Sequence, residues 1–242
     1  MNIVKLFGYE INIFDFDEAL SYAFELEKQD KVSQIVTINP EMFDCAKKDD
    51  KFSQILKNAE MVLPDGIGVK IALKLTGQKS NRIAGIDFAY KMLKLSAQNG
   101  FPIALIGAKQ EVLLRAKENL ENQISNLNIV YIHDGYFQDD KEIINDLKRT
   151  APKLILAALG SPKQEKFIYN LKSSLNFGLA IGVGGSFDVW AGKVKRAPVI
   201  FQKFGLEWLY RTITQPERFK RIFPALPLFI FRALFAKIFN KY

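Results

Sequence analysis

The residue best suited to catalysis is Asp65, which follows a short apolar run in Leu63-Pro64-Asp65-Gly66. A carboxylate that projects into a cleft from the end of a strand can accept the proton of an attacking hydroxyl. The same placement suits an N-cap, because Asp accepts hydrogen bonds from the first backbone N–H groups of a helix. Both roles can coexist, and a helix N-terminus would lower the pKa of the carboxyl and weaken it as a base.

Four further polar residues are candidates: Thr37, Asn39 and Gln164 near expected strand ends, and Arg82 before an expected helix. Thr37 and Asn39 could hydrogen-bond a sugar hydroxyl or acetamide group, although Asn39 suits a helix cap equally well. Arg82 is suited to a diphosphate, because its planar guanidinium donates paired hydrogen bonds; a solvated surface arginine is the alternative. Gln164 lies in Gly160-Ser161-Pro162-Lys163-Gln164-Glu165, where turn and cap chemistry explain most residues but not this one.

Glycines gather at the same kind of position. A glycine at a strand end lets the backbone approach a ligand or turn tightly, and free N–H groups at a helix start can bind phosphate or sugar oxygens. The candidates are Gly107, Gly160, Gly184 and Gly185. The loop around Gly184 lacks the Gly-Lys-Ser/Thr ending of a P-loop. No G-x-G-x-x-G follows a first strand, so a dinucleotide dehydrogenase is poorly supported.

Metal chemistry has little support in the sequence. Asp15-Phe16-Asp17 matches the D-x-D pattern of metal-dependent glycosyltransferases, but it stands where a helix should begin, with Asp17 as its expected cap. His133 is the single histidine and Cys45 the single cysteine, which excludes His-cluster and Cys-based metal sites. We therefore expect no metal site and no cofactor.

The elements that must position these residues alternate between strand and helix. Short apolar runs predict strands at Ser33–Ile38, Met61–Leu63, Ile103–Ile106, Ile129–Ile132, Leu154–Ala158 and Leu179–Val183. Helical patterns lie between them at Asp87–Gln98 (with Asp87 as N-cap), Gln110–Ile124, Lys141–Arg149 and Pro162–Leu171. This order predicts an α/β, Rossmann-like, mostly parallel sheet with helices on both faces. Ligands of such sheets bind beyond the carboxyl ends of the strands, where the candidate residues fall.

Composition divides the chain into two parts. The 242 residues, 48% hydrophobic, suffice for one globular domain, which we place at 1–195. Residues 193–242 hold 11 Lys/Arg against 2 Asp/Glu, whereas residues 1–192 hold 23 against 24. The segment 196–242 is therefore a basic C-terminal appendage that favours anionic partners. The N-terminus has no secretory pattern, and one cysteine fits a reducing cytoplasm.

The appendage combines positive charge with aromatic bulk. Glu207–Thr214 has a helical pattern, Gln215-Pro216-Glu217 breaks it, and Ile222–Phe239 carries five phenylalanines and two prolines. This stretch is too short, too proline-broken and too charged to span a bilayer. We expect a peripheral helix held in the headgroup region of an anionic membrane; a last helix packed on the core is the alternative.

In their order along the chain and in their residues, the motifs together resemble those of the WecG/TagA/CpsF glycosyltransferase family, and the resemblance covers nearly the whole chain. The residues that carry the resemblance are Thr37-x-Asn39, Pro64-Asp65-Gly66-x-Gly68, Arg82-x-x-Gly85-x-Asp87, Gly135-Tyr136-Phe137, Gly160-Ser161-Pro162-Lys163-Gln164-Glu165, Gly184-Gly185-x-Phe187-Asp188, Ala191-Gly192-x-x-x-Arg196-Ala197-Pro198 and Gly205-Leu206-Glu207-Trp208-Leu209-Tyr210-Arg211.

The resemblance implies an inverting transfer of an N-acetylmannosamine-type sugar from its UDP donor. The implied acceptor is N-acetylglucosamine on undecaprenyl diphosphate, for wall teichoic acid or a related surface glycan. Asp65 would be the general base. Residues of the pocket would be Thr37, Asn39 and Gln164 with Arg82 nearby, and the arginines of the appendage that meet the diphosphate would be Arg211, Arg218 and Arg221.

Alternatives remain at this stage. The donor could be UDP-N-acetylmannosaminuronic acid or a hexose, for capsule or common-antigen synthesis. A nucleic-acid-binding module would expose a basic face with stacking Tyr or Trp, whereas this appendage interleaves charge with Phe and aliphatic residues, so we expect no nucleic-acid partner. An inactive scaffold is disfavoured by the intact Asp65 and Gln164. We expect a cytoplasmic enzyme on the inner face of the membrane, and a homo-oligomer is left open.

Overall fold

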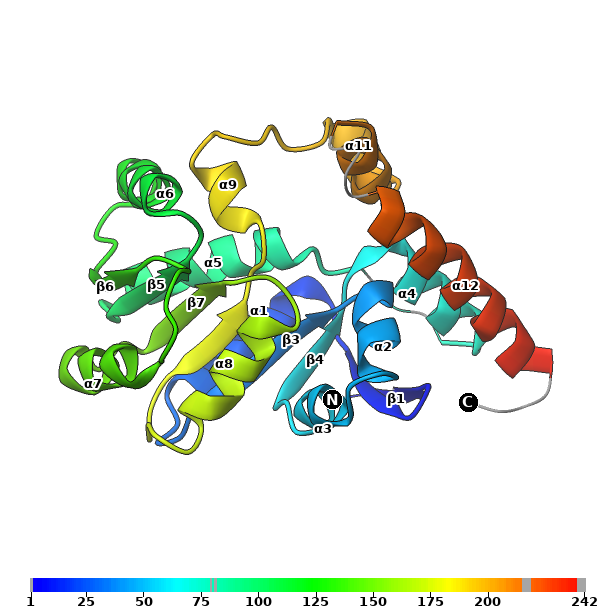
Figure 1. Ribbon diagram of the computed structural model, residues 1–242, viewed down its shortest axis with the longest axis horizontal. Helices are drawn as coiled ribbons and strands as arrows, with labels where there is room; N and C mark the ends of the chain where they lie inside the picture. The colour runs from blue at the N-terminus through cyan, green and yellow to red at the C-terminus, as the bar shows by residue number, and fades with distance from the viewer. Residues whose placement is uncertain (1, 79, 81, 215–218, 239–242) are drawn as a thin grey trace.

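The chain folds around a six-stranded parallel sheet (Figure 1). The computed structural model describes residues 2–78, 80, 82–214 and 219–238, with the backbone only at 211 and 219–224. Across the sheet the strand order is β4-β3-β8-β7-β5-β6. These strands are β3 (Ser33–Ile38), β4 (Met61–Pro64), β5 (Ile103–Gly107), β6 (Ile129–His133), β7 (Leu154–Ala158) and β8 (Leu179–Gly182). All neighbouring strands pair in parallel, so their carboxyl ends meet at one edge.

Helices cover both faces of this sheet. One face packs against α1 (Phe16–Glu27), α5 (Gly85–Gln98), α6 (Gln110–Gln123) and α9 (Ser186–Trp190). The other face packs against α2 (Pro40–Ala46), α3 (Asp50–Lys57), α4 (Gly66–Leu75), α7 (Lys141–Thr150) and α8 (Lys163–Leu171). Successive strand side chains alternate between these layers: Ile35 and Val36 of β3, for example, are both buried, but in different clusters. Central strands of a parallel sheet are apolar on both faces for this reason.

A small antiparallel hairpin precedes the sheet. It joins β1 (Asn2–Leu6) to β2 (Tyr9–Ile13) and packs its buried side chains with those of α2 and α3. Beside strand β4, the buried Asn12 accepts a hydrogen bond through Oδ1 from the backbone N–H of Val62, at 2.7 Å. This hairpin was not among the elements expected from the sequence.

The predicted α/β architecture is confirmed, and strand bounds differ from the expected ones by at most one residue. Two expected helix caps are wrong. Asp15 caps α1, because its carboxylate and that of Glu18 form a reciprocal capping box, and Asp17 lies inside the first turn. Helix α5 begins at Gly85 with Ala84 as its N-cap, so Asp87 lies in the first turn and its carboxylate is available for another partner.

The C-terminal segment forms α10 (Val199–Lys203), α11 (Glu207–Thr214) and α12 (Phe219–Ile238). Helix α12 lies beside α2 and α4, at the β4 end of the molecule and away from β6 (Figure 1). The expectation that prolines break this stretch is wrong, since one helix runs through Pro224 and Pro227. Packing of Phe229 and Ala233 on the α2–α4 layer outweighs the two missing N–H donors. In the described part of the chain, no helix is both long and apolar enough to cross a bilayer.

Candidate active site

The candidate residues lie at the carboxyl edge of the sheet. Asn39 follows β3, Asp65 follows β4, Gly160 follows β7 and Gly184 follows β8, and these four strands are adjacent in the order β4-β3-β8-β7. Gly107, at the end of β5, continues the row. The sheet therefore gathers the predicted residues along one edge, where ligands of open α/β sheets bind.

Asp65 caps α4 and also faces an arginine. Its Oδ1 accepts a hydrogen bond from the N–H of Gly66 at 2.7 Å and lies 3.6 Å from Nε of Arg82. Burial raises the pKa of the Asp65 carboxyl above its ordinary value, against the opposing effects of Arg82 and the Gly66 N–H. The helix N-terminus lowers the pKa through the Gly66 N–H, as expected, but loss of hydration is the larger effect, so the net shift is upward. A carboxylate of raised pKa is a stronger base than an exposed one.

Arg82 is largely buried beside Asp65 and is not a solvated surface residue, with 16% of its side chain exposed. It lies between α4 and α5, and its Nη1 donates to the carbonyl of Gln202 at 3.2 Å. Its Nη2 pairs with the carboxylate of Glu207 at the start of α11. Arg82 thus connects the proposed base to the C-terminal segment.

Two further residues, Glu207 and Arg196, extend the Asp65–Arg82 pair into an ionic cluster, and neither role was expected from the sequence. Glu207, 8% exposed, accepts from Arg82 and, at 3.4 Å, from Nε of Arg196. Arg196 also donates two hydrogen bonds of 2.6 Å to the carboxylate of Asp87. Charges of alternating sign therefore run from Asp65 through Arg82, Glu207 and Arg196 to Asp87. The available signal was compositional: Glu207 is one of two acids in the basic segment 193–242.

Gln164 joins α8 to the loop after β8. Its Oε1 accepts from the N–H of Gly184 at 3.0 Å, and its Nε2 donates to Glu165 at 2.7 Å. A Cβ at Gly182 would lie 2.4 Å from Nε2 of Gln164, which explains a glycine there. Burial raises the pKa of the Glu165 carboxyl. The amide is thus held in one orientation below the glycine loop, with 6% of Gln164 exposed.

Thr37 and Asn39 both make contacts with the start of a helix. Oδ1 of Asn39 accepts from the N–H of Met42 at 3.2 Å, so Asn39 is the N-cap of α2, as one interpretation of the sequence expected. Thr37 lies against Gly85 at the start of α5, where a Cβ would come 2.9 Å from Oγ1 of Thr37. This contact brings α5 close to the end of β3.

The remaining glycines differ in what surrounds them. Gly107 has φ +127°, and a Cβ there would lie 2.4 Å from the carbonyl oxygen of Ala158, so close strand packing accounts for it. Gly160 (φ +74°) and Gly184 (φ +50°) have open space where a Cβ would be. Gly185 begins α9 as its N-cap. Backbone at 160 and 184 is therefore open to an approaching ligand.

The arginines expected to meet a diphosphate are only partly described. Arg211 lies in α11 and Arg221 in α12, both with backbone only, and Arg218 lies outside the described residues. In the described ranges, no group of three or more His, Cys, Asp or Glu side chains is placed to hold a metal ion.

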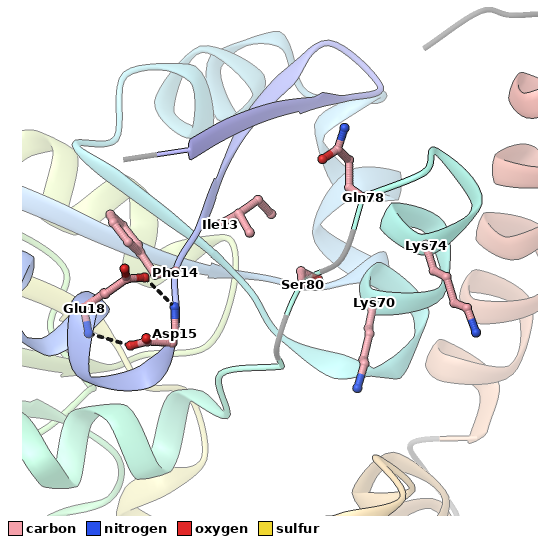
Figure 2. A pocket seen from close by; sticks show the side chains of 8 residues that line it. All are labelled: Ile13, Phe14, Asp15, Glu18, Lys70, Lys74, Gln78 and Ser80. Carbon is pink, nitrogen blue, oxygen red and sulfur yellow. Dashed lines mark hydrogen bonds between the residues drawn. The ribbon is translucent and has the colours of Figure 1, made fainter.

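A separate pocket of about 530 Å³ lies beside α4 (Figure 2). Its lining comes from the β2–α1 junction, from later turns of α4 and from the segment that follows α4, namely Ile13, Phe14, Asp15, Glu18, Lys70, Lys74, Gln78 and Ser80. Asp15 and Glu18 are held by their reciprocal capping bonds, and Lys70 and Lys74 project from the α4 side (Figure 2). The predicted site residues do not line this pocket.

Comparison with known proteins agrees with this geometry. Residues 4–242 match the glycosyl transferase WecG/TagA/CpsF family. A relative from Bacillus spizizenii (strain ATCC 23059 / NRRL B-14472 / W23) is 36% identical over 219 residues, covering 88% of this chain and 85% of that protein. A second relative, from Bacillus subtilis (strain 168), is 39% identical over 189 residues, covering 78% of this chain and 74% of that protein. Both are named N-acetylglucosaminyldiphosphoundecaprenol N-acetyl-beta-D-mannosaminyltransferase. The chain is therefore a member of the WecG/TagA/CpsF family of glycosyltransferases.

Proposed function

We propose that this chain transfers N-acetylmannosamine from a UDP donor to N-acetylglucosamine carried on undecaprenyl diphosphate. The main supporting observation is that the half-buried Asp65, with 29% of its side chain exposed, lies beside Arg82 after β4, so that a base and a cation meet at one point. The names of the two relatives support the choice of sugar and acceptor. Neither name mentions a uronic acid or hexose donor.

The reaction needs a base for the acceptor. In an inverting transfer, the acceptor hydroxyl attacks the anomeric carbon on the face opposite to UDP. Asp65 takes the hydroxyl proton while the new C–O bond forms, and the bond to the diphosphate breaks with its electron pair going to UDP. The raised pKa of Asp65 makes this proton transfer easier, and the Arg82 cation opposes the rise in pKa and so favours the ionised carboxylate.

The leaving diphosphate needs positive charge. Displacement of UDP builds negative charge, which a preorganised cation stabilises more strongly in a partly dry site than in water. Arg82 is one such cation, and Arg211, Arg218 and Arg221 are further ones contributed by the C-terminal segment. Thr37, Asn39, Gln164 and the open backbone at Gly160 and Gly184 would surround the sugars.

The C-terminal segment, which we treat as an appendage from residue 196 onward, would bring the enzyme to its lipid substrate. Helix α12 buries Ala225, Phe229, Ala233 and Ala236 against the body and exposes a second apolar face, with Phe231 65% and Ile238 74% exposed. Exposed apolar bulk beside basic residues suits the headgroup region of an anionic bilayer. We infer a peripheral enzyme on the cytoplasmic face of the membrane.

The proposal is tested by UDP release from UDP-N-acetylmannosamine in the presence of a lipid-diphosphate N-acetylglucosamine acceptor. Wild type should release UDP only when acceptor is present, and Asp65→Asn should lower kcat by about 10²–10⁴-fold. Parallel reactions with EDTA and with Mg²⁺ show whether a metal takes part. Inactivity of folded wild type under every condition would reject this donor–acceptor pair, and full activity of the variant would reject Asp65 as base.

A further inference from the structure

The carboxylate of Glu207 lies between two guanidinium groups. It pairs with Arg82 on one side and with Arg196 on the other, and 10% of its side chain is exposed. Arg196 is itself fixed by the two 2.6 Å hydrogen bonds to Asp87 in α5. Glu207 belongs to the C-terminal segment and is therefore tied to the body of the protein directly through Arg82 and indirectly through Arg196, which is paired with Asp87.

Arg82 is shared between two acids in this arrangement. Its Nη2 contacts Glu207 and its Nη1 contacts the carbonyl of Gln202, while its Nε lies 3.6 Å from Asp65 without a hydrogen bond. Only 16% of the Arg82 side chain is exposed, and a largely buried charge without a partner is costly. If Glu207 were neutral, the remaining carboxylate within reach would be Asp65.

We propose, building on the function proposed above, that Glu207 is a positioning residue: it draws the Arg82 guanidinium partly away from Asp65 and makes this state depend on a seated C-terminal segment. With Glu207 in place, Asp65 keeps an oxygen available for the acceptor hydroxyl and Arg82 remains oriented toward the site. Without it, Arg82 closes onto Asp65 and occupies the base.

The direction of the effect on Asp65 follows from the charges around it. Glu207 raises the pKa of the Asp65 carboxyl, whereas Arg82 lowers it. The charged groups of this cluster are Arg82 after α4, Arg196 before α10 and Asp87 in α5. Removing the charge of Glu207 removes a repulsive carboxylate and brings Arg82 closer, so both changes lower the pKa of Asp65.

The experiment compares wild type with Glu207→Gln, which keeps the shape of the side chain and removes its charge. Two quantities are measured: the pH dependence of kcat for UDP release, and the titration of Asp65 by ¹³C NMR of labelled aspartate carboxyls, assigned with Asp65→Asn. We expect kcat to fall about tenfold or more, with the acid limb of its pH profile and the Asp65 titration midpoint both moved to lower pH. The NMR titration needs no turnover, so it tests Glu207 even if the proposed donor–acceptor pair is wrong.

Asp44→Asn is the matched control, because it removes another ion pair between body and appendage, the one with Arg232 of α12, without touching Arg82. It should leave the Asp65 titration unchanged. An unmoved or raised midpoint in Glu207→Gln overturns the proposal, even if kcat falls, because a merely structural role would lower kcat alone. If Glu207→Gln does not fold, Glu207→Asp retracts the carboxylate by one methylene, and a midpoint unchanged in that variant overturns the proposal equally.

Discussion

The buried carboxylate of Glu27 makes stability depend on pH. Glu27 ends α1 with 0% exposure and accepts a 2.7 Å hydrogen bond from Ser96 of α5. Burial raises its pKa from 4.5 to about 7, against the opposing effects of Ser96, Lys153 and Lys28. A raised carboxyl pKa adds stability that is fully present below the unfolded pKa of 4.5 and is lost as pH rises through 7. Linkage then predicts a loss of about 2.5 kcal/mol in the free energy of unfolding between pH 5 and pH 8.

Glu27→Gln should remove this dependence, because the amide does not titrate and can still accept from Ser96. The assay is urea unfolding followed by circular dichroism at pH 5, 6, 7 and 8, with the difference between wild type and variant isolating Glu27 from other acids. Glu25→Gln, whose side chain is 66% exposed on the same helix, is the control and should follow wild type at every pH. A difference between wild type and Glu27→Gln that stays constant across this range would refute the reasoning.

Three further outcomes are expected. Gly182→Ala should lower kcat/KM for UDP release about tenfold to a hundredfold, because its Cβ displaces Gln164; unchanged kinetics would show that this amide has no part in the site. Phe231→Ser should weaken cosedimentation with anionic vesicles about tenfold, and equal retention, or preference for duplex DNA over vesicles, would count against the membrane role of α12. Asp44→Asn should lower the Tm by about 3 °C, because Arg232 loses its partner; a Tm equal to that of wild type would mean that the pair adds no stability.

The sheet could be predicted because its signals are local. Leu154–Ala158 is a continuous apolar stretch and Ser33–Ile38 is rich in β-branched residues, and both are strands with those bounds. Parallel order then places the residue after each strand at one edge, which is why Asp65 and Gly184 could be assigned to a common site. The role of Asp65 as the N-cap of α4 could also be predicted, because Asp65 directly precedes a helical pattern.

The ionic cluster could not be predicted, because its partners are far apart in sequence. Arg82 and Glu207 are 125 residues apart, and Arg196 and Asp87 are 109 apart. The local sequence pattern predicts that Asp87 caps a helix, whereas in the folded chain its carboxylate accepts two hydrogen bonds from Arg196. The sign of the pKa shift of Asp65 also depends on burial, which no local motif reports. The continuity of α12 through its prolines likewise depends on the layer beneath it.

The hairpin at the start of the chain has a consequence for how copies of this protein can meet. Strand β4 is one of the two edge strands of the sheet. The unpaired backbone N–H groups of an edge strand can form hydrogen bonds with a strand of another molecule. Here the side-chain oxygen of Asn12 accepts a hydrogen bond from the N–H of Val62, and strand β2 of the hairpin lies against β4. The strand that carries the proposed base is thereby protected from lateral annealing and aggregation. Pairing of two copies edge to edge along β4 is therefore disfavoured.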